Sequence, residues 1–402
     1  MSDELIPSDA LPRGFRFAAV RAGIKPSGNP DFAIAVADRA ANAAAMFTAN
    51  QIQAAPLTIG RRHLQRSGGQ VRVVVVNAGN ANCATGEAGL LACEQVCRAA
   101  AETFGCAGHE VFPSSTGIIG VPLPAEKLVA ALPDAKSSLS LDAQSFARAI
   151  LTTDTRPKVA HAAISIGGKT VRLIGVCKGA GMIHPQLVPH ATMLVYLFTD
   201  AAIDPPELNR FLASAVGQTF NRISIDGDTS TNDTVLLLAS GASDVKISAS
   251  DTAFADALLS VCTSLAKQIV SDGEGVTHVV ELLIEGAAGD ADALKIAKAI
   301  AHSPLVKTAW AGCDPNWGRL IAAAGYSGAA IDPARIAVWF GSLPVCANGG
   351  RAPSFDEHAA HEYLQQREYS IRISVGAGSG RCRFWTTDLT AEYVRINADY
   401  ST

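Results

Sequence analysis

The chain has 402 residues, of which 48% are hydrophobic and 17% are charged, so it can bury a large core and form two or three domain-sized units. Its net charge of −4 argues against a broad basic surface for nucleic acid or an anionic membrane and favours small-molecule partners. The nine cysteines include no Cys-x-x-Cys pair, which is typical of buried thiols in a reducing compartment. An acidic N-terminus, without an apolar run of about 20 residues along the chain, predicts a cytoplasmic protein.

Apolar runs bounded by turn residues predict strands, and apolar residues at helical spacing predict helices, in alternation along the chain. The predicted strands cover residues 72–76, 193–198, 235–238, 279–284, 336–340 and 371–375. The predicted helices cover residues 89–104, 205–216, 254–270 and 290–302. This pattern predicts a mixed α+β fold in which helices cover layered sheets. It also predicts a hairpin turn at residues 376–380 and a loose segment at residues 347–358.

Small polar residues and glycines gather in five segments that have little apolar content. These are residues 77–86, 114–117, 152–158, 178–182 and 226–233. Several follow an apolar strand directly, as Asn77 follows residues 73–76, and loops at strand ends are a common place for a site on a rigid scaffold. Ordinary turns use the same residue types for backbone reasons, so each segment taken alone has both interpretations.

Thr192 stands at the start of a predicted apolar strand, directly after a loop that contains Gly and Pro. A threonine hydroxyl is a weak nucleophile unless a base is adjacent to it. One solution makes the threonine the first residue of a chain, so that its own α-amino group, with a pKa of about 7.7–8.0, takes the proton. This requires cleavage between Ala191 and Thr192. The alternative is a β-branched strand residue without a catalytic role.

Eight motifs together closely resemble the ornithine acetyltransferase family, the glutamate N-acetyltransferases of arginine biosynthesis. They are Ser115-Thr-Gly-Ile-Ile-Gly120, Thr152-Thr-Asp-Thr155, Lys178-Gly-Ala-Gly-Met-Ile-His-Pro185, Ala191-Thr-Met-Leu194, Asp226-Gly-Asp-Thr-Ser-Thr-Asn232, Asp272-Gly-Glu-Gly275, Cys313-Asp-Pro-Asn-Trp-Gly-Arg319 and Arg395-Ile-Asn-Ala-Asp-Tyr-Ser-Thr402. The motifs stand in the order of the family, and the resemblance extends from about Arg13 to the last residue. It implies a layered fold like that of the aminopeptidases with an N-terminal nucleophile. One departure is the segment 186–190, which is longer than the family pattern and implies a reshaped cleavage loop.

The resemblance implies that Thr192 is the autocatalytic nucleophile and that the bond between Ala191 and Thr192 is cleaved by the protein itself. It places the oxyanion-stabilising pair on Thr116 and Gly117, where a hydroxyl and a backbone N–H can face a developing negative charge without reorganising. It places the substrate contacts on the following residues: Thr152, Lys178, Thr192, Glu274, Asn397 and Thr402.

These residues fit an acetyl transfer from N-acetylornithine to glutamate through an ester on Thr192. Lys178 could pair with the α-carboxylate of the substrate, and Glu274 could bind its amino group or position the amine of Thr192. No metal or organic cofactor is expected, because the ester preserves the acyl transfer potential. Some members of the family also accept acetyl-CoA as the donor. The resemblance further implies that residues 1–191 and 192–402 fold together as one interlocked, two-lobed unit and assemble as a heterotetramer.

Other functions remain open from the residues alone. A hydrolase or aminopeptidase could use the same self-generated nucleophile, and would differ by admitting water to the acyl-enzyme. A nucleotide-binding module at residues 376–380 is disfavoured, because that run lacks both glycine-rich phosphate-binding patterns. A zinc site at His358 and His361 lacks a clear third ligand. Without the resemblance, Lys178 could be a solvated loop lysine and Glu274 a carboxylate at a helix end. Asn397 and Thr402 could belong to an ordinary polar C-terminal tail.

Overall fold

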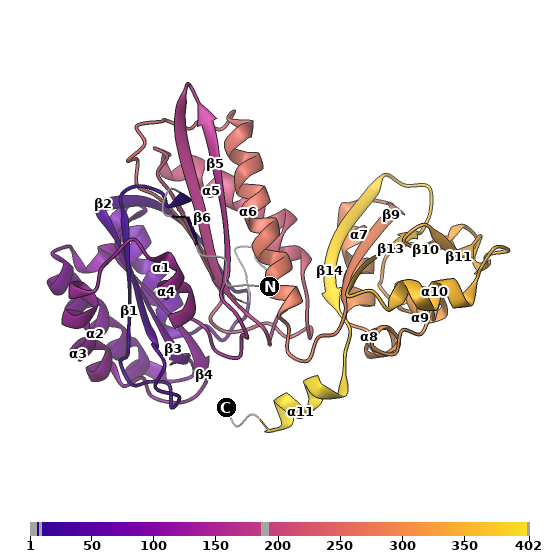
Figure 1. Cartoon of the computed structure of the whole chain (residues 1–402), viewed down its shortest axis with the longest axis horizontal. Helices are drawn as coiled ribbons and strands as arrows, with labels where there is room; N and C mark the ends of the chain where they lie inside the picture. Colours follow the sequence, from indigo (N-terminus) through magenta and orange to yellow (C-terminus); the bar gives the residue numbers. More distant parts are fainter. Residues whose placement is uncertain (1–5, 8–9, 186–192, 400–402) are drawn as a thin grey trace. The chain divides into compact units, whose positions relative to one another are not determined.

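The computed structural model describes residues 6–7, 10–185 and 193–399, and the chain forms two compact units (Figure 1). The first unit extends to Asn221 and includes Thr229–Ile269, and the second contains Arg222–Asp228 and the residues from Val270 onward. Both units combine a sheet with helices, which confirms the predicted fold class. The division into residues 1–191 and 192–402 stays a prediction, because Ala191 and Thr192 lie outside the described residues.

The sheet of the first unit has the strand order β4-β3-β2-β8-β7-β6-β5, with β1 paired on β2. Its strands are β1 (Phe15–Val20), β2 (Phe32–Phe47), β3 (Gln70–Asn80), β4 (Val111–Ile118), β5 (Lys158–Ile166), β6 (Lys169–Lys178), β7 (Leu194–Thr199) and β8 (Thr234–Ala239). The pairs β3–β4 and β7–β8 are parallel, and the other pairs are antiparallel. Strands β6 and β7 therefore join segments from both sides of the predicted cleavage point.

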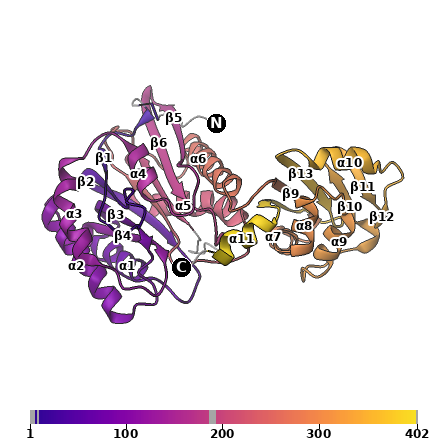
Figure 2. The same cartoon turned by 60° about the horizontal axis from the view of Figure 1, so that its bottom comes forward.

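Helices cover the two faces of this sheet. They are α1 (Ala55–Ser67), α2 (Gly86–Phe104), α3 (Ala125–Ser137), α4 (Ala143–Ala149), α5 (Pro205–Gln218) and α6 (Thr252–Ser271), with 3₁₀ turns η2 (Gly108–Glu110) and η3 (Phe220–Arg222). Figure 2 shows α2 and α3 together beside β1, β3 and β4, where they bury Val73 and Val75. A second core lies on the other face of the sheet. There Phe17 of β1 and Phe146 of α4 make edge-to-face contacts with Phe198 of β7, so α4 packs on this face.

Helix α6 is, among the described residues, the one helix long and apolar enough to cross a membrane. Half of its most apolar window is buried inside the fold. Gly175 of β6 makes room for it, because a Cβ there would lie 2.6 Å from Leu265 and 3.0 Å from Val261. These contacts make α6 a core helix packed on the sheet, as its apolar face predicts.

The second unit has a sheet of strand order β12-β11-β10-β13-β9-β14. Its elements are β9 (Val279–Ala287), α7 (Asp290–Ala301), α8 (Pro304–Ala311), α9 (Trp317–Gly325), η4 (Pro333–Arg335), β10 (Ala337–Phe340), β11 (Leu343–Ala347), β12 (Gly350–Arg351), α10 (Glu357–Leu364), β13 (Glu368–Ser374), β14 (Gly380–Thr387) and α11 (Ala391–Asp399). One core joins the inner residues of this sheet to α7, α8, α9 and α10. All predicted strands and helices are present, with ends that differ by a few residues.

The predicted hairpin at residues 376–380 is wrong. Strand β9 lies between β13 and β14, parallel to the first and antiparallel to the second. The glycine-rich loop therefore crosses the end of β9, and a Cβ at Gly378 would lie 2.0 Å from the carbonyl oxygen of Ala287. The segment predicted to be loose is also partly ordered, because it contains β12, which pairs with β11, and the start of α10.

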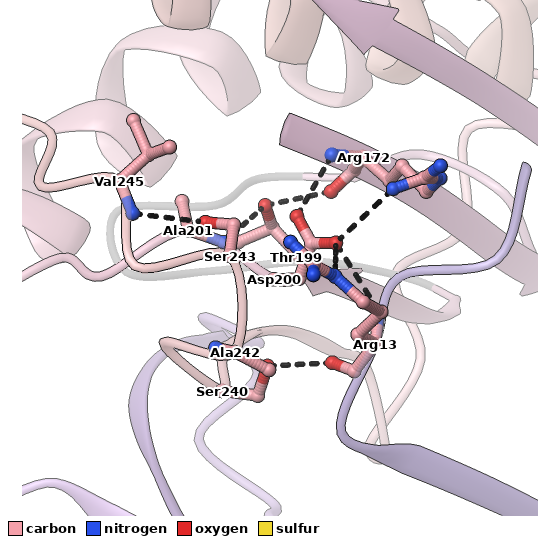
Figure 3. A network of polar contacts seen from close by, with 9 residues as sticks. All are labelled: Arg13, Arg172, Thr199, Asp200, Ala201, Ser240, Ala242, Ser243 and Val245. Atoms are coloured by element: carbon pink, nitrogen blue, oxygen red, sulfur yellow. Dashed lines mark hydrogen bonds and ion pairs between the residues drawn. The ribbon is translucent and has the colours of Figure 1, made fainter. Parts of the chain in front are cut away.

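The far end of β7 is fixed by a network around Asp200 (Figure 3). Its carboxylate, which is fully buried, accepts hydrogen bonds from the backbone N–H of Arg172 at 2.9 Å and of Arg13 at 3.3 Å. The hydroxyl of Thr199 donates to the carbonyl of Arg172 at 2.8 Å. This network fixes the register between β6 and β7 and thereby the position at which β7 begins.

Candidate functional site

The near end of β7 is where the chain arrives from the predicted nucleophile. Thr192 and Ala191 lie outside the described residues, but the next residue, Met193, is buried, and its carbonyl accepts a hydrogen bond from the N–H of Thr234 at 2.7 Å. Leu194 lies opposite Lys178 of β6 and Thr234 of β8. The strand that follows the predicted nucleophile thus begins between the end of β6 and the start of β8.

The predicted oxyanion pair lies at the end of β4, in an irregular part of its parallel pairing with β3. Thr116 and Gly117 lie opposite Ala78 and Gly79, and the register shifts at the next residue, Asn80. Gly117 has a φ of 129°, and a Cβ there would lie 2.3 Å from the carbonyl carbon of Gly79. Only glycine fits this position, because both the conformation and the space exclude a side chain. Such a bulge re-aims the backbone at the edge of a site.

Asn232, the last residue of the motif 226–232, connects these two places, and sequence reasoning assigned it no role. Its side-chain N–H groups donate to the carbonyl of Ser115 at 2.8 Å and to that of Ala81 at 2.6 Å, and the residue is only 5% exposed. Asn232 precedes Thr234 by two residues, so one short segment holds both Ser115 and Met193. The predicted nucleophile directly precedes Met193 and the predicted oxyanion pair directly follows Ser115, so both adjoin residues that are bound to the same piece of chain.

Lys178 and Thr152 are brought together, as two contacts to one substrate require. The Nζ of Lys178 donates to the Oγ1 of Thr152 at 2.7 Å. Both groups are held by Asp154, which sequence reasoning did not single out. Its carboxylate lies 3.8 Å from the Nζ of Lys178 and accepts the N–H of Thr152 at 3.1 Å and of Gly179 at 2.6 Å.

Asp154 is fully buried together with a second cation, Lys158, whose Nζ lies 2.6 Å from the carboxylate. Burial alone would raise the pKa of the Asp154 carboxyl, but Lys178 and Lys158 outweigh it and hold that pKa well below its usual range. The carboxylate is therefore charged at neutral pH and fixes Lys178 beside the start of β7. The signal for this residue is present in the sequence, as an acidic residue within the segment 152–158.

A turn of the N-terminal region places a third lysine near this group. The buried carboxylate of Asp31 accepts the backbone N–H of Ala22, Ile24 and Lys25 at 2.5–2.8 Å. The Nζ of Lys25 donates to the carbonyl of Ala149 at 3.0 Å, just before the segment that contains Asp154. Burial lowers the pKa of Lys25, against the effect of the Asp31 charge.

Glu274 and Asn397 are also brought together, within the second unit. The side-chain N–H of Asn397 donates to Glu274 at 2.9 Å. Helix α11 starts against the loop of Glu274, since the hydroxyl of Thr390 donates to the carbonyl of Gly275 at 2.7 Å. Thr402 lies outside the described residues. The predicted substrate contacts thus form two pairs, one in each compact unit.

The two histidines weighed as zinc ligands have other contacts. The Nδ1 of His361 bonds to the carbonyl of Cys313 at 2.7 Å, and His358 lies 3.4 Å from Glu362. Within residues 6–7, 10–185 and 193–399, no three His, Cys, Asp or Glu side chains form a group that could hold a metal ion.

The chain is similar to known proteins over nearly its whole length. A model of the ArgJ family matches residues 16–402. The arginine biosynthesis bifunctional protein ArgJ of Agrobacterium fabrum is 44% identical over 397 residues, which cover 96% of this chain and 95% of that protein. The protein of the same name from Rhizobium meliloti is 45% identical with the same coverage. The chain belongs to the ArgJ family. A crystal structure of the ArgJ protein from Bacillus halodurans is 41% identical, with a TM-score of 0.50, over 52% of this chain and 100% of the solved chain.

Membership in the ArgJ family confirms the resemblance that the motifs carry, and with it the prediction of an acyltransferase of arginine biosynthesis. The roles of the individual site residues stay predictions, because similarity over the whole chain does not assign a role to any one residue. In this ArgJ chain the geometry adds Asp154, Asn232 and Lys25 to them. Each also contacts a residue that is distant in sequence, namely Lys178, Ser115 and Ala149 respectively, and no local pattern could assign those partners.

Proposed function

We propose that this chain transfers an acetyl group from N-acetylornithine to glutamate through an acetyl ester on Thr192, giving ornithine and N-acetylglutamate. Family membership and the order of the motifs support this reaction. The observation that carries the assignment of Thr192 is the segment 232–234, which binds Met193 on one side and Ser115 on the other. A nucleophile that precedes Met193 and an oxyanion pair that follows Ser115 would start from positions fixed relative to each other.

Thr192 becomes the first residue of its chain when the protein cleaves the bond to Ala191, leaving chains of 191 and 211 residues. The two products would stay together, because β6 from the first pairs with β7 from the second over six residue pairs. The solved chain from Bacillus halodurans corresponds to 52% of this chain, the share that a product of 211 residues would have. Two copies of each product would form the proposed heterotetramer, in the cytoplasm.

The chemistry needs one base and one oxyanion site. The neutral α-amine of Thr192 takes the proton of its own hydroxyl, and the oxygen attacks the acetyl carbonyl carbon. The hydroxyl of Thr116 and the N–H of Gly117 stabilise the negative oxygen of the tetrahedral intermediate. The C–N bond then breaks, and the departing amine of ornithine takes the proton from the α-ammonium group. The amine of glutamate attacks the ester in the reverse sequence and restores the Thr192 hydroxyl.

The proposed substrate contacts come from two pairs of residues, Lys178 with Thr152 and Glu274 with Asn397. Lys178, held by Asp154, offers its ammonium group to the α-carboxylate that N-acetylornithine and glutamate share, and Thr152 adds a hydroxyl. Glu274 and Asn397, together with Thr402, are proposed as further contacts, with the Glu274 carboxylate suited to an ammonium group. No metal or organic cofactor takes part in these steps, and acetyl-CoA is a second donor to be tested.

Mass analysis of the denatured protein tests this proposal. Wild-type protein is expected to give two masses, and Thr192→Ala one intact mass with no acetyl transfer. Thr192→Ser is the matched control, because it keeps a hydroxyl and an α-amine and is expected to cleave and to transfer. A single intact mass in a wild-type protein that transfers acetyl groups would contradict the role of the Thr192 amine.

The hydrolase alternative predicts different products. A transferase that shields its ester from water releases little acetate when glutamate is absent and produces N-acetylglutamate when it is present. Acetate release at the same rate with and without glutamate would instead favour an amidohydrolase that uses the same Thr192.

A further inference from the structure

A hollow of about 370 Å³ lies between α1, α2 and η2, away from the residues discussed so far. It is lined by Arg62, Arg66, Arg98, His63, His109 and Glu94, among others. Its volume falls within the range of about 300–1,000 Å³ that is typical of small-molecule sites. Helices α1 and α2, labelled in Figure 2, belong to the first unit together with η2. The hollow is therefore formed within one compact unit.

The charges around this hollow do not balance. Glu94 is the carboxylate of the lining, and it forms an ion pair with Arg62. Arg66 and Arg98 have no hydrogen-bond or ion-pair partner in the part of the chain that the structure describes, and the same holds for His109. Arg62 and Arg66 also stand one helical turn apart on α1, a spacing at which like charges repel. Two solvent-exposed guanidinium groups therefore line the hollow without a counter-charge from the described residues, on a protein whose net charge is −4.

His63 forms the floor of the hollow and is buried to nine-tenths. Its Nδ1 bonds to the carbonyl of Val111 at 2.7 Å, and because a carbonyl only accepts, this nitrogen carries the proton. The contact also locates the hollow at the start of β4. Thr116 lies five residues further along that strand, roughly 16 Å away at about 3.3 Å per residue. The hollow is therefore separate from the proposed oxyanion pair.

We propose that this hollow binds a small molecule that carries two adjacent phosphate groups. The cations are all arginines, whose planar guanidinium groups donate two parallel hydrogen bonds to a phosphate, and they converge from two different helices. Adjacent phosphates would supply counter-charges to Arg66 and Arg98 together. The net charge of the chain is −4, which fits a small anion held by a few arginines better than the long backbone of a nucleic acid.

Calorimetric titration of the complete wild-type protein with sodium pyrophosphate, at constant ionic strength, tests this site. One saturable site per chain is expected. The double variant Arg66→Gln/Arg98→Gln is expected to weaken the affinity by about ten-fold or more, because it removes charge-assisted hydrogen bonds. The matched control is Arg16→Gln/Arg39→Gln, which removes the same charge from exposed positions of the same unit and is expected to leave the affinity within about two-fold. Thermal melts verify that both variants are folded.

Three further titrations test which anion binds and where it binds. Orthophosphate is expected to bind at least about ten-fold more weakly than pyrophosphate, and equal affinity would overturn the requirement for adjacent phosphates. Lys178→Met is expected to keep the affinity, and its loss would place the anion at the proposed substrate lysine instead. A short oligonucleotide that binds more tightly than pyrophosphate would overturn the small-molecule ligand. Absence of saturable binding, or equal losses in the two double variants, would overturn the site itself.

Discussion

The two ends of the β6–β7 pair each have a buried carboxylate with two cations, and they differ in where those cations lie. At one end Asp154 is paired with Lys158, which is fully buried, and with Lys178, whose side chain is 10% exposed. At the other end Asp200 faces Arg13 and Arg172, whose side chains are 55% and 25% exposed (Figure 3). The same charges are thus enclosed at one end and open to water at the other.

This difference separates a proposed site from a structural clamp. The arginine side chains around Asp200 are open to water. The hydrogen bonds to the Asp200 carboxylate come from the backbone N–H groups of Arg172 and Arg13, so this network fixes the register between β6 and β7. Around Asp154 the side chains are enclosed, and Lys178 is held in place beside the start of β7. A buried ion pair is costly to assemble and adds little net stability, so its presence at the Asp154 end calls for a role beyond folding.

The largest expected effect is that of Asp154→Asn. The amide keeps the shape but leaves two lysines without a counter-charge, one of them fully buried. Breaking a buried pair in this way costs about 3–5 kcal/mol of unfolding free energy. Urea unfolding measures this cost, and steady-state kinetics at permissive temperature should show a raised KM for both substrates. A loss below about 1 kcal/mol, the range of exposed pairs, would contradict the enclosed state of this cluster.

Removing one hydroxyl from the proposed site and one from the Asp200 network sharpens the comparison. Thr116→Val should lower kcat by roughly 10²-fold or more with little change in KM, because an oxyanion donor acts only in the transition state. Thr199→Val removes a hydroxyl of similar size from the Asp200 network and should leave kcat within about two-fold. If both variants turn over like the wild type, Thr116 has no part in the mechanism.

Asp200→Asn is expected to have a smaller effect than Asp154→Asn. The amide group can still accept one of the backbone hydrogen bonds, and the arginines are hydrated. We expect a loss of about 1–3 kcal/mol in unfolding free energy, the usual cost of a buried hydrogen-bond partner, with unchanged KM. Denaturant unfolding and kinetics on the same preparation check this. A rise in KM equal to that of the Asp154 variant would mean that the two ends do not differ in role.

The smallest expected effect is a dependence on pH. The pKa of Asp154 lies below the ordinary value of about 3.9, so its contribution to stability is fully present above about pH 4 and is lost as the pH falls through the lowered value. The gap in unfolding free energy between wild type and Asp154→Asn should stay constant from about pH 7 to pH 5 and should narrow below about pH 4. A gap that narrows already between about pH 7 and pH 6 would show that another group governs it.

Local patterns in the sequence determined the elements. The apolar runs at residues 279–284 and 371–375 and the helical face of Phe254, Leu258 and Val261 depend on residues close in sequence, so strands and helices follow from periodicity. The motifs identified the family, and they brought Thr116 and Gly117 forward together, because the two are adjacent in the sequence. The proposed nucleophile at Thr192 also came from the sequence, and the structure does not describe that residue.

Only the tertiary structure decided which elements pair. Residues 376–380 have the composition of a hairpin turn, but β9 takes the place between β13 and β14 and the glycines instead allow a close crossing. Asp154 and Asn232 acquire their roles from partners 24 and 117 residues away, at Lys178 and Ser115. Hydrogen bonds and ion pairs across such distances depend on sheet order, and sheet order is set by packing of the whole core rather than by any local run of residues.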